Sequence, residues 1–255
     1  MTQPADILLD ATGATVDPAE IARFSKVAEE WWDPEGNFAP LHRLNPTRLA
    51  YLRDRLGQRF GRTDDSPQPF EGLHLLDIGC GGGLVAEPMA RLGFAVTGID
   101  AAGKSLNIAR AHALSASLAI DYRAATAEAL AASGEQFDVV LALEVIEHVT
   151  ELEAFFAAIR RLVRPGGAVI ISTINRTAKS LALAKIGAEY LLRWVPRGTH
   201  DWKKFLRPSE TAGYCRGVGL AIDDLTGMSF DPFAGSWSLS RDLAVNYVLT
   251  AWPQD

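Results

Sequence analysis

Acidic and glycine residues follow the first predicted buried strand, where a ligand can approach the backbone. The segment LHLLDI (73–78) predicts this strand, and Asp77 stands near its end. The glycines of the turn that follows are Gly79, Gly81, Gly82 and Gly83. Because glycine has no Cβ, such a turn lets a ligand lie against the backbone at the carboxyl edge of a sheet. Asp100 ends the next predicted strand, where a carboxylate can accept hydrogen bonds from both hydroxyls of an adenosine ribose.

This turn departs from the dinucleotide-binding pattern, although Asp100 suits NAD and S-adenosylmethionine equally well. Dinucleotide-binding turns follow G-x-G-x-x-G, whereas the sixth position here is Leu84. A dinucleotide brings a pyrophosphate that binds helix N-terminal amides, while S-adenosylmethionine brings an ammonium, a carboxylate and a sulfonium. Asp77 at the first turn suits a cation. We therefore assign Asp77, Gly79, Gly81 and Asp100 to cofactor binding, with an NAD-dependent dehydrogenase as an alternative.

A second set of reactive side chains follows the predicted strand FDVVLAL (137–143). The segment EVIEHV offers Glu144, Glu147 and His148. If a helix starts at Glu144, the three side chains share one face at i, i+3 and i+4, and a divalent ion such as Mg²⁺ or Zn²⁺ can bind between them. Alternatively, His148 acts alone as a general base through its neutral imidazole. Both hypotheses stay open, and we assign His148 and Glu147 to catalysis.

Alternating strands and helices must position these residues. Further strands are predicted at 94–100, near 120–123 and at 168–173, with helices at 84–92, 105–117 and 152–162. A helix near 209–217 and strands near 221–225 and 245–251 complete the series. This alternation predicts a doubly wound, Rossmann-like α/β fold with a seven-stranded, mostly parallel sheet and helices on both faces.

Other segments surround the predicted core. Residues 1–19 are small and polar and are expected to form a flexible leader, and the aromatic-rich residues 20–70 an N-terminal helical cap. Residues 71–255 then form the main domain, in which the alternation lapses after its fifth strand. We expect a helical insertion there, at about 176–207.

Composition excludes several classes of function. The 255 residues are 48% hydrophobic, which suits one large domain. The formal charge of −6 gives no general attraction for nucleic acid, so no nucleic-acid partner is expected. Two cysteines and the absence of a basic stretch followed by an apolar run predict a cytoplasmic protein. The apolar runs are too short to cross a bilayer as a helix, so membrane contact is expected to be peripheral.

Several segments together resemble class I S-adenosylmethionine methyltransferases and, more closely, the ubiquinone-biosynthesis O-methyltransferase family. The general features are Asp77 beside the glycine turn, FDVVLALEVIEHV, and RLVRPGGAVIIST before strand five. The more specific segments are EIARFSKVAEEWWD (20–33), PLHRLNPTRLAY (40–51), STINRTAKS (172–180) and GAEYLLRWVPRGTHDWKKFLRP (187–208). The resemblance extends over nearly the whole chain from residue 20.

This resemblance implies an enzyme that methylates a ring hydroxyl of polyprenylated catechol and demethylubiquinol intermediates, with S-adenosylmethionine as methyl donor. The family's cofactor positions fall on Arg48, Gly79, Asp100 and Leu143. For eukaryotic relatives, the resemblance implies a divalent metal at the acidic and histidine trio that corresponds to residues 144, 147 and 148. Two alternatives remain: a methyltransferase of another small phenol or lipid, and a non-catalytic cofactor-binding scaffold subunit.

The insertion carries basic, leucine and aromatic residues over about 179–204. A basic amphipathic helix suits an anionic membrane surface, and the resemblance favours contact with acidic phospholipids. The alternative is a lid that packs its leucines on the core. We expect a cytoplasmic protein that associates peripherally with the inner membrane and that other ubiquinone-biosynthesis enzymes can contact.

Overall fold

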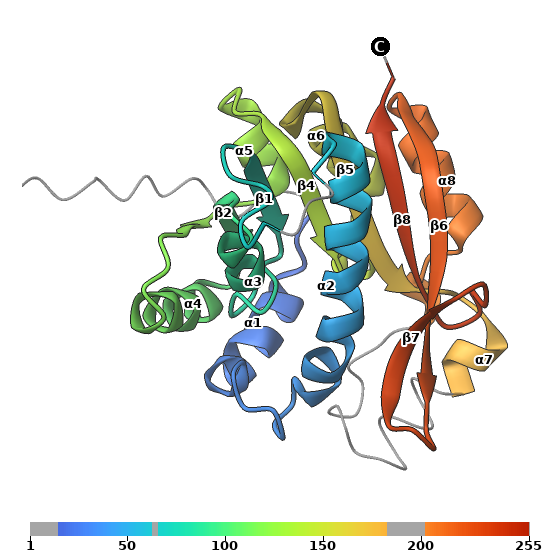
Figure 1. Ribbon diagram of the computed structural model, residues 1–255. Coiled ribbons are helices and arrows are strands. Elements are labelled where there is room, and N and C mark those ends of the chain that lie inside the picture. The colour runs from blue at the N-terminus through green and yellow to red at the C-terminus, as the bar shows by residue number, and fades with distance from the viewer. Residues whose placement is uncertain (1–14, 63–65, 183–201, 255) are drawn as a thin grey trace, which may run out of the picture.

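One mixed sheet with helices on both faces organises the chain (Figure 1). The computed structural model describes residues 15–62, 66–182 and 202–254. The strands are β1 (His74–Ile78), β2 (Ala95–Asp100), β3 (Asp121–Ala124), β4 (Phe137–Leu143), β5 (Val163–Ile174), β6 (Leu220–Asp231), β7 (Ser236–Ser240) and β8 (Asn246–Pro253). They pair in the order β3-β2-β1-β4-β5-β8-β6-β7, with β3 to β5 parallel to one another and the later pairs antiparallel.

The predicted fold class is confirmed, with eight strands rather than seven in the described residues. The additional strand is β7, which forms a hairpin with β6 at the edge of the sheet. Its sequence SWSLS is short, rich in serine and largely exposed, so it lacks the buried apolar run by which the other strands are recognised. The sheet is also less parallel than expected, because β6, β7 and β8 all pair antiparallel.

Helices cover both faces of the sheet. The α-helices are α1 (Pro18–Val27), α2 (Ala39–Phe60), α3 (Ala86–Arg91), α4 (Gly103–Ser115), α5 (Ala127–Ala132), α6 (Leu152–Leu162), α7 (Ala178–Ser180) and α8 (Pro208–Gly217). Alternate residues of β4 point to opposite faces. Val139 and Leu141 pack in the core under α2, α3 and α4, while Val140 and Ala142 pack in the core under α5, α6 and α8.

The N-terminal cap begins earlier than residue 20. Asp17 caps α1 by accepting a hydrogen bond from the Ala19 amide, and Pro18 occupies the first helical position. Val16 forms an antiparallel bridge with Val149. Residues 15–19, which we had assigned to the leader, therefore belong to the folded cap, and residues 1–14 lie outside the described residues.

The insertion predicted at about 176–207 is described only in part, between β5 and α8. Helix α7 begins it, and the short 3₁₀ helix Trp202–Lys204 ends it. Most of the intervening segment, 183–201, lies outside the described residues, so its predicted amphipathic helix stays a prediction. Within the parts of the chain that the structure describes, no helix has the length and apolarity needed to cross a membrane.

Replacement of a core aromatic residue should test this packing. Phe156 on α6 is fully buried and its ring stacks with that of Tyr214 on α8 at 5.2 Å between centroids. We expect Phe156→Ala to lower the free energy of unfolding by about 3–5 kcal/mol, because it leaves a cavity between α6 and the sheet. Urea unfolding followed by circular dichroism measures this. The control Leu114→Ala removes a side chain that is 81% exposed and should change stability by less than about 0.5 kcal/mol.

Candidate active site

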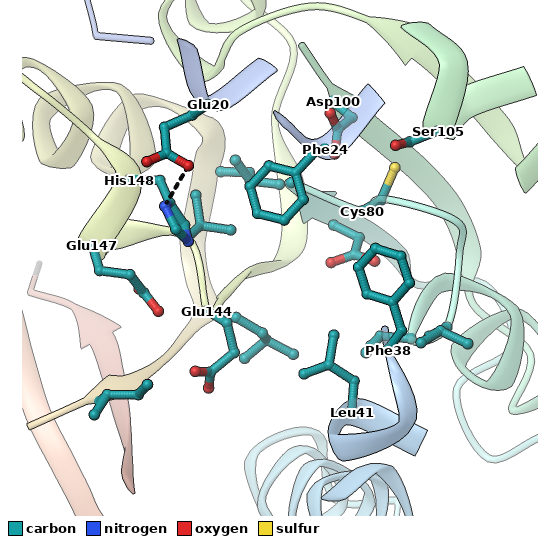
Figure 2. A pocket seen from close by; sticks show the side chains of 18 of the residues that line it. Glu20, Phe24, Phe38, Leu41, Cys80, Asp100, Ser105, Glu144, Glu147 and His148 are labelled. Atoms are coloured by element: carbon teal, nitrogen blue, oxygen red, sulfur yellow. Dashed lines mark ion pairs between the residues drawn. The ribbon is translucent and has the colours of Figure 1, made fainter. Parts of the chain in front are cut away.

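A cavity of about 600 Å³ opens at the carboxyl ends of the parallel strands. Strand β1 pairs with β2 on one side and β4 on the other, so the chain crosses over in opposite directions from this point. Such a switch point leaves a crevice between the loops that follow the strands. The glycine turn, the end of β2 and the segment after β4 line the cavity, and α1, α2 and the β6–β7 hairpin close it (Figure 2).

The turn requires glycine for two reasons, which are its backbone conformation and the close approach of neighbouring side chains. Gly79 has φ +69° and Gly81 has φ +53°, in the left-handed region that side chains disfavour. A Cβ on Gly79 would lie 2.5 Å from Val145 Cγ2, and one on Gly81 would lie 2.3 Å from the Trp31 ring. The cap residue Trp31 thus covers the turn, and its indole nitrogen donates a hydrogen bond to Ser105 Oγ at 3.0 Å.

Arg48 and Asp77 line the cavity with buried charged groups whose hydrogen bonding is incomplete. Both residues are 3% exposed, and Arg48 Nε and Nη2 and Asp77 Oδ2 have no hydrogen-bond partner among the described residues. Burial raises the pKa of Asp77 to about 7, although nearby Arg48 opposes this shift. An acid and a guanidinium with free polar atoms fit the ammonium and carboxylate of a methionine group. The structure therefore brings together the two residues assigned separately by sequence.

Asp100 lies at the end of β2, as predicted. Its Oδ2 accepts a hydrogen bond from the Gly81 amide at 2.9 Å and its Oδ1 accepts one from the Ala102 amide at 2.7 Å. Burial raises the pKa of this carboxyl above its usual range, while the two amide bonds lower it. A carboxylate oxygen has two acceptor sites, so each can still accept a ribose hydroxyl. Leu143, at the end of β4, also lines the cavity.

The helix expected to start at Glu144 is absent. Glu144 has φ +57°, and only a 3₁₀ helix, Ile146–His148, follows it. Glu144 Oε1 accepts a hydrogen bond from Ser172 Oγ at 2.7 Å and lies 3.6 Å from Arg48 Nη2. The predicted i, i+4 face shared by Glu144 and His148 is therefore wrong.

Glu147 and His148 contact different partners. Glu147 is buried, and its Oε2 accepts a hydrogen bond from Thr173 Oγ1 at 2.8 Å. Burial is the largest cause that raises its pKa to about 7, followed by the charge of Glu144. His148 turns instead toward Glu20 on α1 (Figure 2).

The trio as it stands does not fit a metal ion. In residues 15–62, 66–182 and 202–254, no group of three or more His, Cys, Asp or Glu side chains is arranged to hold one. We derive no step through a metal, and the assignment of residues 144, 147 and 148 as ligands stays a prediction.

Sequence reasoning missed Glu20. Its Oε2 lies 3.4 Å from His148 Nδ1, and both side chains line the cavity. In sequence, Glu20 is an acidic residue in the first turn of a helix, a common placement that favours the helix dipole. Nothing local distinguishes it, so only the docking of α1 reveals its position.

Comparisons with known proteins agree with this geometry. A family described as "Methyltransferase domain" matches residues 76–171. The ubiquinone biosynthesis O-methyltransferase of Cereibacter sphaeroides (strain KD131) is 55% identical over 238 residues, which cover 93% of this chain and 96% of the relative. The protein of the same name from Brucella anthropi is 51% identical over 244 residues, covering 96% and 98%.

Solved structures share the fold at low sequence identity. Magnesium protoporphyrin IX methyltransferase from Synechocystis, with bound SAH, has a TM-score of 0.60 at 18% identity and covers 91% of this chain and 94% of its own. A protein from Pyrococcus horikoshii has a TM-score of 0.61 at 16% identity and covers 91% and 99%. Fold and site together define a class I, S-adenosylmethionine-dependent methyltransferase. By its close relatives, the chain belongs to the ubiquinone biosynthesis O-methyltransferase family.

The buried carboxyl of Asp77 should give stability a defined pH dependence. Its pKa of about 7 in the folded protein lies above its ordinary value of 3.8, so the folded state keeps a proton that the unfolded chain loses. As pH rises from about 4 to about 7, the ligand-free protein should lose stability relative to Asp77→Asn, by at most about 1.4 kcal/mol per pH unit.

Urea unfolding of the wild-type protein and of Asp77→Asn measures the difference between their free energies of unfolding. The measurements run from about pH 4.5 to about pH 8, which spans the titration of Asp77. Asp54→Asn, at an exposed carboxyl, is the control and should follow the wild-type profile. Parallel profiles for wild type and Asp77→Asn would show that Asp77 titrates normally.

Proposed function

We propose that this protein transfers the methyl group of S-adenosylmethionine to a ring hydroxyl of polyprenylated catechol and demethylubiquinol intermediates. The observation that carries the proposal is one cavity lined by Arg48 and Asp77, whose buried polar atoms lack hydrogen-bond partners among the described residues, and by the imidazole of His148. The acceptor class is supported by relatives named ubiquinone biosynthesis O-methyltransferase, which match nearly the whole chain.

In this proposal, the residues assigned to cofactor binding hold the methyl donor. Asp77 binds the ammonium and Arg48 the carboxylate of the methionine group, each through a polar atom that lacks a partner in the described structure. Asp100 accepts from the ribose hydroxyls at the end of β2. Gly79 and Gly81 let the ligand approach the turn, and Leu143 packs against it from the end of β4.

Methyl transfer to a phenol needs removal of a proton. An ordinary phenol has a pKa of about 10, so its hydroxyl is mostly protonated at neutral pH. As the oxygen–carbon bond forms and the carbon–sulfur bond breaks in line, the hydroxyl proton passes to the neutral imidazole of His148. The His148 side chain is 20% exposed and lines the cavity, which gives an acceptor access to it.

An apolar wall faces the acceptor side of the cavity. The β6–β7 hairpin contributes Met228, Phe230, Pro232 and Trp237, and the rings of Phe230 and Trp237 lie 5.5 Å apart. These side chains suit an aromatic ring and the first isoprenoid units attached to it. The strand missed by sequence analysis, β7, supplies Trp237 to this wall.

The direct test is product formation with S-adenosylmethionine and a short-tailed prenyl catechol, followed by mass spectrometry. We expect O-methylated product, and we expect His148→Ala to lower kcat by about 10²- to 10⁴-fold with unchanged cofactor affinity, because it removes the base. The exposed His74 provides the control variant His74→Ala, which should keep wild-type turnover.

Chelation of divalent metal separates the two catalytic hypotheses in the same assay. Loss of product on chelation and recovery with Mg²⁺ or Zn²⁺ would favour the metal hypothesis for residues 144, 147 and 148. Product that is indifferent to chelation would favour His148 as general base. Absence of product, despite measured cofactor binding, would contradict the acceptor class.

We further propose that residues 179–204 contact an anionic membrane surface, which would bring a cytoplasmic protein to the inner membrane where a polyprenylated acceptor dissolves. The support is the basic and aromatic sequence of this segment, most of which lies outside the described residues. Its described ends carry Lys179 and Lys204, which form ion pairs with Asp242 and with Asp17. Contact with other ubiquinone-biosynthesis enzymes stays a prediction.

Flotation with liposomes tests membrane contact. We expect the protein to float with vesicles that contain anionic phospholipid and to remain in solution with neutral vesicles, because basic side chains are attracted electrostatically only to the anionic surface. Added salt should weaken the association. Equal flotation with both kinds of vesicle, or none with either, would remove the proposal.

A further inference from the structure

The imidazole of His148 is held by the N-terminal helix and not by its own segment. Glu20 Oε2 lies 3.4 Å from His148 Nδ1, and the Phe24 ring contacts the imidazole edge-on, with 5.4 Å between centroids and 89° between planes. Glu20 and Phe24 both belong to α1, one turn apart. Figure 2 shows the two side chains reaching His148 from the side opposite Glu147.

Glu20 is a charged partner in a partly buried setting. Its side chain is 16% exposed, and the contact with His148 is the largest cause that lowers the pKa of its carboxyl. Arg23 pairs with the same carboxylate, and Lys204 Nζ lies 3.8 Å from Glu20 Oε1. Glu20 Oε2 is buried and makes no hydrogen bond among the described residues, so it is free to accept one from His148 Nδ1–H, 3.4 Å away.

Backbone contacts fix α1 relative to His148. Val16 bridges Val149, the residue directly after His148, and the Thr150 amide donates to the Thr15 carbonyl at 3.0 Å. Thr15 Oγ1 also donates to Glu128 Oε2 at 2.9 Å. The start of α1 is thus joined to the same short segment that carries the histidine, which sets the distance between Glu20 and the ring.

We propose that Glu20 is a positioning residue that holds the Nδ1–H tautomer of His148 and directs Nε2, with its lone pair, toward the acceptor hydroxyl. This inference rests on the proposed function. The acceptor proton passes to Nε2 as the methyl group is transferred, and Glu20 remains an anion throughout. Its charge stabilises the imidazolium that forms, as a carboxylate does when it accepts from the far nitrogen of a catalytic histidine.

Two substitutions separate orientation from charge. Glu20→Ala removes both, and we expect kcat to fall about 10- to 100-fold. The dissociation constant for S-adenosylmethionine should stay unchanged, because the Glu20 carboxylate pairs with His148, Arg23 and Lys204 and not with Arg48 or Asp77. Glu20→Gln keeps an oxygen acceptor for Nδ1–H and should recover part of the loss. The matched control is Glu29→Gln, which changes an exposed carboxylate of the same cap and should leave kcat unchanged.

A double-mutant cycle distinguishes action through His148 from a general effect. In the His148→Ala background, Glu20→Ala should have no further effect on kcat, because the side chain it positions is gone. Equal losses from Glu20→Ala in both backgrounds would overturn the proposal, as would a Glu20→Ala enzyme with wild-type kcat.

A spectroscopic readout is independent of turnover. Nitrogen-15 NMR of the His148 imidazole in the folded, full-length protein reports which ring nitrogen carries the proton at neutral pH. We expect the Nδ1–H form in the wild-type protein and in Glu20→Gln, and a shift toward the Nε2–H form in Glu20→Ala. An Nε2–H form in the wild-type protein would overturn the proposal even if methyl transfer is found. An Nδ1–H form without any methylated product would instead contradict the proposed function.

Discussion

The pairing of β1 with β2 on one side and β4 on the other is the constraint on which the site depends. The crossovers leave this point in opposite directions, so the carboxyl ends of these strands open into one crevice. Residues distant in the chain meet there, with Asp77 near the end of β1, Asp100 at the end of β2 and His148 after β4. Cores on both faces of the sheet hold the strands rigidly and so hold these side chains in place.

Charge buried in the crevice links stability to ligand binding. Arg48 is almost inaccessible to water, and desolvation is the largest cause that lowers its pKa, although Glu144, Asp77 and Glu147 oppose the shift. Burying charged groups without full pairing costs free energy in the ligand-free protein. A ligand with its own ammonium and carboxylate offsets this cost by completing the missing contacts. If Arg48 and Asp77 bind the methyl donor as proposed, this arrangement is unfavourable in the ligand-free protein and favourable when the donor is bound.

The N-terminal cap is part of the active site as well as its cover. The rings of Trp31 and Phe38 stack at 3.7 Å, and Trp31 occupies the space that a side chain at Gly81 would need. The adjacent Trp32 donates its indole N–H to the Gly82 carbonyl at 2.9 Å. These contacts anchor the cap on the glycine turn, while α1 brings Glu20 to His148. The glycines proposed to admit the ligand therefore also make room for the cap.

The sequence by itself determined the alternating core and the acids at the strand ends, because buried strands and the residues that follow them are marked by local patterns. The sequence suggests Arg48 as a cofactor-binding residue only through family resemblance, since an arginine on a helix is common, and that role stays a prediction. The edge strand β7 was not predictable because its exposed, serine-rich residues bury little. The positive φ of Glu144 and the approach of Glu20 to His148 were decided by tertiary structure alone. Both depend on how distant segments dock against each other, and no spacing within either segment records that docking.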